Sequence, residues 1–299
     1  MRITLVPSAL ANILAGYLLA NQSWLPVAPL VCLLFASACL YCAGMVLNDV
    51  FDFDIDTKER PERPLPSGEI SKNAARNVGL GLLLAGIALA FVAGILVSSP
   101  VRPTCIAIGL AVSVFLYDGP LKRTPIAPAI MGLCRGLNLL LGASLFVAES
   151  GLFGFPPVVL WIAASLTVLI FGVTWFAREE TRHNSVGQLL LPALVITAGL
   201  IGVIFASFAP GATESERLRN LYPMLVAMLS VSIATRLQRA VFNGTPKNIQ
   251  QAVVSVLRSL IIFDAAACYL AVPEQPGYAL AVLCLLIPSL ILSRRIAST

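Results

Sequence analysis

Four aspartates lie within eight positions, directly after a long apolar segment of an otherwise hydrophobic chain. They are Asp49, Asp52, Asp54 and Asp56, and Asn48 precedes them. If a helix continues through this stretch, a turn of about 100° per residue brings Asn48 and three of the aspartates onto one face, with Asp54 pointing away. Ionised carboxylates this close repel one another, so a cation among them is favoured.

The chemistry of this face suits a magnesium ion. Mg²⁺ prefers oxygen ligands and typically takes one or two carboxylates together with waters and substrate phosphates. A calcium loop of the EF-hand type fits poorly, because its glycine and its terminal glutamate are missing from their places. A solvated acidic helix end is the structural alternative. The pattern favours a metal site at Asp49, Asp52 and Asp56, with Asn48 beside it.

A loop rich in proline and positive charge follows the acids, with the sequence "KERPERPLPSGEIS". Pro61 ends the helix, since proline lacks the backbone N–H and clashes with the preceding turn. We expect the loop to turn back over the carboxylates. Arg60 and Arg63 would then face a phosphate across the metal, which the planar guanidinium binds well.

The elements that position these residues are membrane-spanning helices. The chain of 299 residues is 58% hydrophobic and 12% charged, with a mean hydropathy of +0.88, whereas a soluble domain is about 25% charged. Apolar runs near the roughly 20 residues that cross a bilayer recur along its length. The ten candidates are about 3–20, 27–48, 73–98, 103–117, 125–147, 156–177, 187–209, 219–240, 249–271 and 276–293.

These runs are continuous rather than alternating, and only helices or closed barrels can span lipid. The predicted fold class is therefore all-α: a polytopic integral membrane helical bundle of nine or ten spans. Nine is possible because the fourth run is short and the eighth ends in a polar turn. No separate soluble domain fits in the gaps, so residues 1–299 form a single domain. The first span lacks a basic leader and a clear cleavage site, which predicts that it is retained.

The positive charges are distributed unequally over the two sides that ten alternating spans create. Arg102, Arg217 and Arg219 fall on one side, and the other basic residues outside the spans fall on the opposite side. Such an excess marks the cytoplasmic side. We predict a protein of a bacterial inner (plasma) membrane, with both termini and the acidic loop in the cytoplasm. The net charge of +5 follows from this topology and requires no nucleic-acid partner.

The acidic stretch resembles the NDxxDxxxD motif of the UbiA superfamily of intramembrane prenyltransferases. Asn48, Asp49, Asp52 and Asp56 match it, and "RPERPLPSG" is similar to the family's continuation. The resemblance implies a helical bundle with a cytoplasm-facing central cavity, a polyprenyl diphosphate donor and Mg²⁺. It also implies transfer of the prenyl group to a small acceptor, aromatic or lipid-like, within the bilayer.

A second stretch, "FLYDGPLKRTP", resembles the family's turn between the fourth and fifth spans. The resemblance implies that Lys122 and Arg123 touch diphosphate oxygens and that Tyr117 lies at the substrate. The alternatives are that the two cations are positive-inside anchors and that Tyr117 is an interfacial belt residue.

The family's second acidic motif is altered in this chain, which has "TWFAREETRHNSVGQ" after the sixth span. Glu179 and Glu180 are adjacent and lie about 100° apart on a helix, so they are not equivalent metal ligands. On the resemblance, one glutamate binds metal while Arg178, Arg182 or His183 faces phosphate. The "REE" variant is similar to a subgroup of UbiA-like proteins sometimes called EboC. The alteration leaves the second metal, and with it turnover, as an open question.

Polar residues inside a membrane span mark functional sites by default. Arg135 and Asn138 lie three positions apart in "CRGLNLLLG", on one face of the fifth span. The resemblance to the family, which often has Arg-Gly in this place, implies that both face the cavity as substrate contacts. Asn12 in the first span is a further candidate. Asp264, from another span, is a candidate partner of Arg135. A structural ion pair and a substrate contact are both compatible with this pattern.

These interpretations combine into one predicted mechanism. Asp49, Asp52 and Asp56 hold Mg²⁺ against the donor diphosphate. Lys122 and Arg123 assist, so that the allylic carbon–oxygen bond ionises, and the apolar interior shelters the carbocation until the acceptor captures it.

Two other classes of function stay open. One is a binding or scaffold protein of the same fold that has lost turnover. The other is a transporter, because polar residues in broken spans also mark transport paths, although here the acids cluster at the rim of the membrane. The acceptor, the donor chain length and the oligomeric state are not specified by the sequence.

Overall fold

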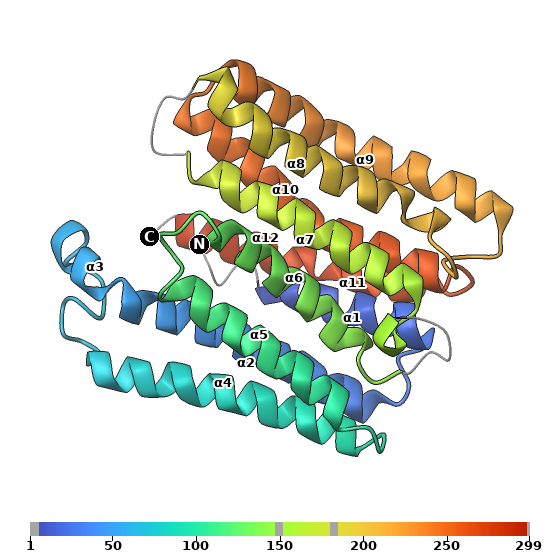
Figure 1. Ribbon diagram of the computed structural model, residues 1–299, viewed down its shortest axis with the longest axis horizontal. Helices are drawn as coiled ribbons and strands as arrows, with labels where there is room; N and C mark the ends of the chain where they lie inside the picture. The colour runs from blue at the N-terminus through green and yellow to red at the C-terminus, as the bar shows by residue number, and fades with distance from the viewer. Residues whose placement is uncertain (1–5, 147–151, 180–184, 298–299) are drawn as a thin grey trace.

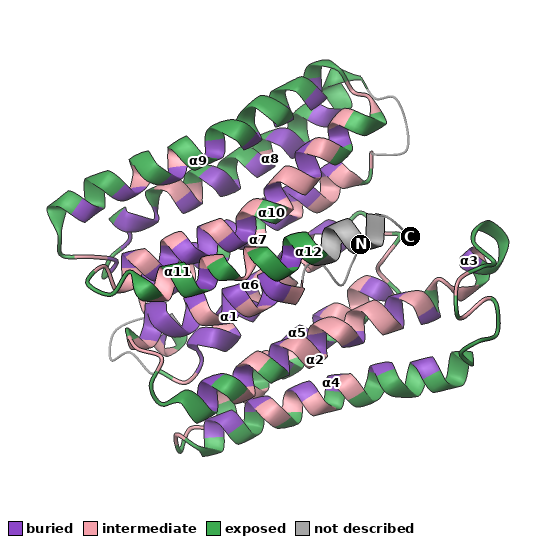
Figure 2. Cartoon of the chain, turned by 180° about the vertical axis from the view of Figure 1, so that it is seen from behind, coloured by how far each residue is buried: buried purple, intermediate pink, exposed green. Residues whose placement is uncertain are grey.

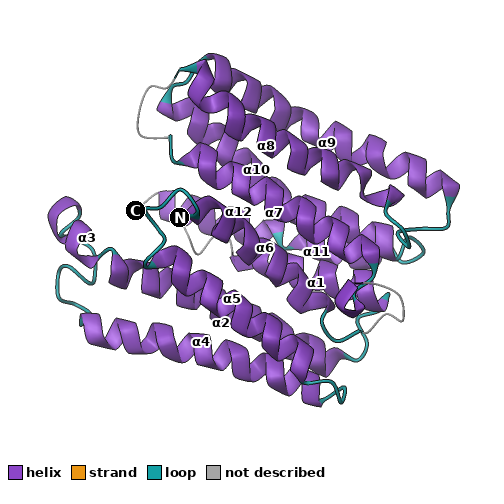
Figure 3. Ribbon diagram, in the orientation of Figure 1, coloured by secondary structure: helices purple, strands orange, loops and turns teal. Residues whose placement is uncertain are grey.

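The structure, a computed structural model, describes residues 6–146, 152–179 and 185–297. Within these ranges every regular element is a helix and no strand occurs, which confirms the predicted all-α class (Figure 3). The α-helices are α1 (Val6–Asn21), α2 (Val27–Phe51), α3 (Phe53–Glu59), α4 (Lys72–Ile95), α5 (Val101–Asp118), α6 (Ala127–Ala143), α7 (Pro157–Ala177), α8 (Val186–Ile204), α9 (Glu216–Phe242), α10 (Pro246–Ala271), α11 (Gly277–Cys284) and α12 (Leu286–Ala297).

Each of the ten apolar runs contains a helix in the structure. Seven helical segments of the described chain are long and apolar enough to cross a membrane: Val27–Phe51, Lys72–Ile95, Val101–Asp118, Pro157–Ala177, Val186–Phe208, Glu216–Phe242 and Pro246–Ala271. Three shorter apolar helices, Val6–Asn21, Ala127–Ala143 and Gly277–Ile291, account for the remaining runs. The number of complete crossings therefore stays a prediction.

Local sequence explains where several helices begin. The Ser71 hydroxyl accepts a hydrogen bond from the Ala74 N–H at 3.2 Å and caps α4. Thr245 caps α10 in the same way, through the Asn248 N–H at 3.3 Å, and Pro246 occupies the first helical position, where its missing N–H is no loss. These caps hold the ends of the helices at the turns that the sequence predicts.

Small residues let the central helices approach closely. A Cβ atom added to Gly16 of α1 would overlap with the Leu139 carbonyl of α6, and one added to Gly142 of α6 would overlap with the Ile13 carbonyl of α1. Backbone contact of this kind is typical of helices that associate inside a bilayer. The tight α1–α6 pairing matters for function because both helices line the cavity described below.

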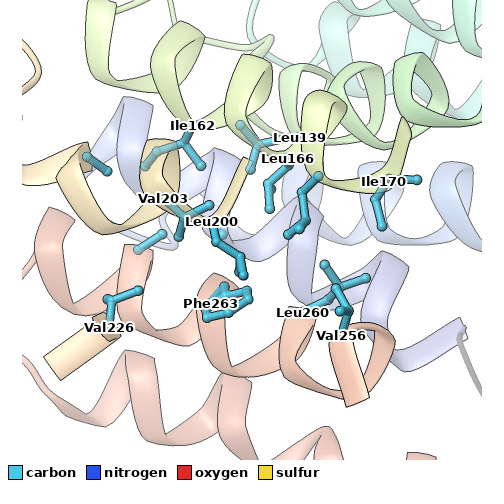
Figure 4. Close-up of a cluster of buried hydrophobic side chains, with 14 of the residues drawn as sticks. Leu139, Ile162, Leu166, Ile170, Leu200, Val203, Val226, Val256, Leu260 and Phe263 are labelled. Atoms are coloured by element: carbon cyan, nitrogen blue, oxygen red, sulfur yellow. The ribbon is translucent and has the colours of Figure 1, made fainter. Parts of the chain in front are cut away.

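The buried core joins helices from the middle and the C-terminal part of the chain. Figure 4 shows Leu139 of α6, Leu166 of α7, Leu200 of α8 and Phe263 of α10 converging in one apolar cluster. The outward surface is apolar as well, with Leu84 on α4 and Met228 on α9 among its large exposed side chains, and Figure 2 shows that the outer faces of these helices are exposed. An apolar outer surface of this extent fits contact with lipid.

The helices run side by side, with α2, α4 and α5 along one side, α8 and α9 along the other, and α1, α6 and α7 between them (Figure 1). The beginning of α1, the end of α12 and the short helix α3 all lie toward the same end of the bundle (Figure 1). This arrangement is what the predicted sidedness requires of the motif and the termini. Their orientation in a cell membrane stays a prediction.

Candidate active site

The acidic stretch forms a nearly continuous helical path out of α2. Helix α2 ends at Phe51, Asp52 occupies the junction with φ −83° and ψ 0°, and α3 begins at Phe53. The Asp52 N–H donates to the Asn48 carbonyl and the Asp56 N–H donates to the Asp52 carbonyl, both at 2.9 Å. The uninterrupted helix that the sequence predicted through these residues is therefore broken at Asp52, where α3 turns away from the axis of α2 (Figure 1).

The side chains of the acidic stretch point in the directions that the helical periodicity predicts. Asn48 and Asp56 are buried, whereas Asp49 and Asp52 are half-buried. The Asp54 side chain is 88% exposed, and its carboxylate lies 3.9 Å from the Lys72 ammonium. The prediction that Asp54 points away from the others is confirmed.

Two cations lie among the remaining carboxylates. Arg63 Nη1 donates to Asp56 Oδ2 at 2.6 Å and lies 3.9 Å from Asp49 Oδ1. The Lys122 ammonium, from the turn after α5, forms an ion pair with Asp52. The proline-rich loop thus turns back over the acids as predicted. It brings Arg63 into contact with Asp56, whereas Arg60 stays exposed.

The carboxylates at this position can be compared with the needs of a metal ion in their chemistry and in their arrangement. The described residues contain no group of three or more His, Cys, Asp or Glu side chains arranged to hold a metal ion. Asp49, Asp52 and Asp56 nevertheless present oxygen ligands only, which is the donor set that Mg²⁺ prefers. In chemical type they fit Mg²⁺, and the ion pairs with Arg63 and Lys122 show that this position attracts positive charge.

The α5–α6 turn adds an acid that the sequence reasoning did not select. Asp118 is the last residue of α5, is buried, and accepts a hydrogen bond from the Asn48 side-chain amide at 2.8 Å. Gly44 lies against it, since an added Cβ would come within 3.3 Å of Asp118 Oδ2. The signal was available: an aspartate at the end of an apolar span, beside Tyr117. Tyr117 is half-buried and Arg123 is exposed.

The end of α7 is tied to this turn. Arg178 donates through Nη2 to the backbone carbonyls of Lys122 and Thr124, at 3.1 and 2.8 Å. Arg178 therefore holds the backbone that carries Lys122, and Glu179 next to it is half-buried. The other predicted residues of the second motif, Glu180, Arg182 and His183, lie outside the described residues.

We call the charged cluster of Asp49, Asp52, Asp56, Arg63 and Lys122 the rim. Behind it lies a cavity of about 410 Å³, within the range of pockets that bind small molecules. Six helices and the α5–α6 turn line it, with polar groups at the rim, apolar walls, and polar groups again at the inner end. The lining residues are Ser8, Ala9, Ser37, Leu40, Tyr41, Gly44, Met45, Asn48, Leu110, Val114, Tyr117, Asp118, Lys122, Met131, Cys134, Arg135, Asn138, Ile170, Val173, Thr174, Ala177, Val253, Leu257 and Leu260.

An ion pair lies at the inner end of the cavity. Arg135 Nη2 donates to Asp264 Oδ2 at 2.6 Å, and the two side chains are only 10% and 1% exposed. Arg135 Nη1 donates to the Ser8 carbonyl at 3.0 Å and to the Ser8 hydroxyl at 2.9 Å. The predicted pairing of Arg135 with Asp264 is confirmed.

Asn138 extends this pair into a network across four helices. Its amide nitrogen donates to the Ala9 carbonyl at 2.9 Å and to Asn12 Oδ1 at 3.2 Å, and its oxygen accepts from the Ser37 hydroxyl at 2.7 Å. Asn12 in turn donates to Asp264 Oδ1 at 3.1 Å. Arg135 and Asn138 both line the cavity, as the resemblance implied.

Fold and site together define a polytopic helical membrane protein with a cavity whose rim gathers carboxylates and cations. The model of the UbiA prenyltransferase family matches residues 9–255, and the chain belongs to this family.

Relatives of the chain include archaeal enzymes named digeranylgeranylglyceryl phosphate synthase. The chain is 32% identical over 159 residues to that of Methanopyrus kandleri, where the match covers 52% of this chain and 54% of the relative, about half its length. It is 28% identical over 279 residues to that of Saccharolobus solfataricus, covering 88% and 93%. A UbiA homologue from Archaeoglobus fulgidus, bound to GPP and Mg²⁺, has a TM-score of 0.61 at 16% identity, covering 94% of this chain and 98% of that one. This structural likeness concerns the fold.

Proposed function

We propose that the protein is an intramembrane prenyltransferase that moves a prenyl group from a polyprenyl diphosphate to a small aromatic or lipid-like acceptor, with Mg²⁺ as cofactor. The observation that carries the proposal is the meeting of carboxylates, Lys122 and Arg63 at the mouth of an apolar cavity. The GPP and Mg²⁺ bound by the A. fulgidus homologue, and the synthase names of the archaeal relatives, support it.

The rim would hold the diphosphate. Asp49, Asp52 and Asp56 are the proposed ligands of Mg²⁺, which when bound would neutralise the diphosphate and stabilise it as a leaving group. Lys122 and Arg63 lie among these carboxylates, so each can donate to a phosphate oxygen without leaving the rim. The exposed Arg60 and Arg123 add positive charge at the same end.

Several residues near the rim would act by holding other side chains or backbone groups in place. Asp118 fixes one side of the Asn48 amide, and Arg178 fixes the backbone of Lys122. We propose that Tyr117, which lines the cavity, contacts the donor. We also propose that Arg178, Arg182 or His183 faces a phosphate and that one of Glu179 and Glu180 binds metal. Unequal loss of Mg²⁺ dependence in Glu179→Gln and Glu180→Gln is then expected, because adjacent residues point in different directions.

The walls of the cavity would protect the reaction from water. Leu110, Val114, Ile170, Val173 and Leu257 present apolar side chains between the rim and the inner end. The allylic carbon–oxygen bond breaks with its electron pair leaving on the diphosphate. The acceptor then supplies the electron pair for the new bond and afterwards loses a proton. Exclusion of water keeps the allylic cation from being hydrolysed.

We further propose that the motif loops and both termini face the cytoplasm of a plasma membrane. The excess of lysine and arginine on the motif side supports this orientation. The relatives reported above are archaeal, and a bacterial inner membrane stays a prediction.

The proposal is tested with the purified protein in lipid nanodiscs, labelled prenyl diphosphates of several lengths, and acceptors that include phenols and glyceryl phosphate lipids. Product should form with Mg²⁺ and not with EDTA, and should be lost in Asp52→Asn but kept in Asp54→Asn, a matched change at the exposed aspartate. Mg²⁺-dependent donor binding without product from any acceptor would instead support a binding protein of the same fold. Absence of donor binding would refute the assignment.

A further inference from the structure

The inner end of the cavity carries more polar chemistry than a tunnel for a prenyl chain needs. We call this inner end the floor of the cavity. Ser37 at the floor and Asn48 at the rim are both on α2, eleven residues apart, so the floor lies about 16 Å along the helix from the rim. Polar and charged side chains at such a depth are costly in a membrane and are kept where they serve a site. Ser8, Ser37, Arg135 and Asn138 all line the cavity there.

The guanidinium of Arg135 retains hydrogen-bonding capacity. It has five N–H donors. Nη1 makes two contacts to Ser8 and Nη2 makes one to Asp264. Within the described part of the chain, the second N–H of Nη2 therefore has no hydrogen-bond partner, and the fully buried Nε has none either. The side chain is nine-tenths buried and lines the cavity. A donor without a partner is costly, so a ligand oxygen that accepts a hydrogen bond from the free N–H of Nη2 would be stabilised.

The charge of the floor limits which oxygen can bind. Asp264 already neutralises Arg135 at 2.6 Å, and the pair is shielded from water. A second anion would be repelled by Asp264 and would lose its own hydration. A hydroxyl or carbonyl oxygen would accept a hydrogen bond from the free N–H of Arg135 and would add no charge.

We propose that the floor of the cavity is a subsite for an uncharged, oxygen-bearing head of the prenyl acceptor, such as a phenol, an alcohol or a quinone carbonyl. Arg135 donates to this oxygen, while Asp264 and Ser8 hold the guanidinium in place. The inference rests on the proposed function, and it narrows the acceptor to compounds whose buried end is neutral.

A matched pair of probes with one oxygen-bearing head each tests the subsite: 4-methylbenzyl alcohol, which is neutral, and 4-methylbenzoate, which is anionic. Binding is measured by equilibrium dialysis on the full-length protein in nanodiscs, with EDTA and without donor. The wild-type protein should bind the neutral probe roughly tenfold more tightly or better, because the anionic probe loses its hydration and is repelled by Asp264. Asp264→Asn leaves the guanidinium uncompensated and should reverse the preference.

Removing one partner of a buried ion pair can unfold a protein, so a second variant replaces both. The paired change Arg135→Leu with Asp264→Leu exchanges the charges for apolar side chains, which buried pairs often tolerate. It should keep the fold and lose about tenfold in affinity for the neutral probe. Arg258→Gln is the matched control, because Arg258 is an exposed cation on the same helix α10.

Three results would overturn the subsite: wild-type affinity for the neutral probe in the paired variant, an unchanged preference in Asp264→Asn, or a wild-type protein that does not favour the neutral probe. A purely structural ion pair would produce the first two. Because the dialysis contains neither donor nor Mg²⁺, its outcome is independent of the prenyl-transfer assay. Loss of the proposed function with retained probe selectivity would therefore be recognised as a failure of the rim chemistry and not of the floor.

Discussion

If Asp49 and Asp56 bind Mg²⁺ as proposed, Arg63 competes with the metal ion for the same carboxylates, and this competition can be measured. Its guanidinium bonds Asp56 at 2.6 Å and lies 3.9 Å from Asp49. If Mg²⁺ binds these two acids, it must share them with Arg63. The change Arg63→Gln therefore should raise the affinity of the free protein for Mg²⁺, although it should lower the affinity for the donor diphosphate.

The size of the effect follows from burial. The Arg63 side chain is 33% exposed and that of Asp56 is 11% exposed, so the pair lies between a surface ion pair, worth about 0–1 kcal/mol, and a buried one, whose disruption costs about 3–5 kcal/mol. An intermediate value of about 1–2 kcal/mol is reasonable after solvent screening. It corresponds to a factor of about 5–30 in an equilibrium constant.

Isothermal titration of Mg²⁺ into donor-free protein in nanodiscs measures the change directly. Lys58→Gln is the control, because it removes one positive charge from α3 at an exposed position, where screening reduces its influence. An Arg63→Gln protein with wild-type or weaker Mg²⁺ affinity, while Lys58→Gln behaves normally, would refute the idea that the acids of the rim are the metal ligands.

Three further predictions concern the metal ligands, the topology and the packing. Asp52→Ala should abolish Mg²⁺-dependent donor binding and leave the thermal unfolding of the protein nearly unchanged, which titration and a melting curve check together. Cysteine placed in 61–69 should label only from the cytoplasmic side, and cysteine in 212–216 only from the outside; labelling of both from one side would contradict the ten-span topology. Gly142→Ala, which places a methyl group against a carbonyl of α1, should destabilise the protein by about 1–3 kcal/mol. Gly81→Ala, with open space around it, should not.

The acidic side of the rim could be predicted because its geometry is local. Helical periodicity alone separates Asp54 from Asp49 and Asp56, and the structure keeps that separation although the helix is interrupted at Asp52. The prolines after Glu59 force the chain to turn, which returns Arg63 to Asp56 only seven positions away. Short-range rules therefore determine most of this part of the candidate site.

The cavity could not be predicted in the same way, because its contacts join distant spans. Asp118 meets Asn48 across 70 positions, and Ser37 meets Asn138 across 101. Which spans are neighbours depends on packing, such as the close approach of Gly16 to α6, and no local pattern contains that information. The pairing of Arg135 with Asp264 is the one long-range contact of the cavity that could be predicted. A charge inside a membrane requires an opposite charge as its partner, and few acidic residues lie within the spans.

The two polar ends of the cavity differ in how easily their partners can be exchanged. At the rim, Arg63 and Lys122 are partly open to solvent, so water can compensate when either cation moves from a carboxylate to a phosphate oxygen. At the floor, Arg135 and Asp264 are shielded from water, and separating them would leave an uncompensated charge. A charged group that must enter and leave is therefore compatible with the rim, whereas the floor can only orient a group that leaves its ion pair intact. This asymmetry supports the proposal that the diphosphate binds at the rim and a neutral acceptor head at the floor.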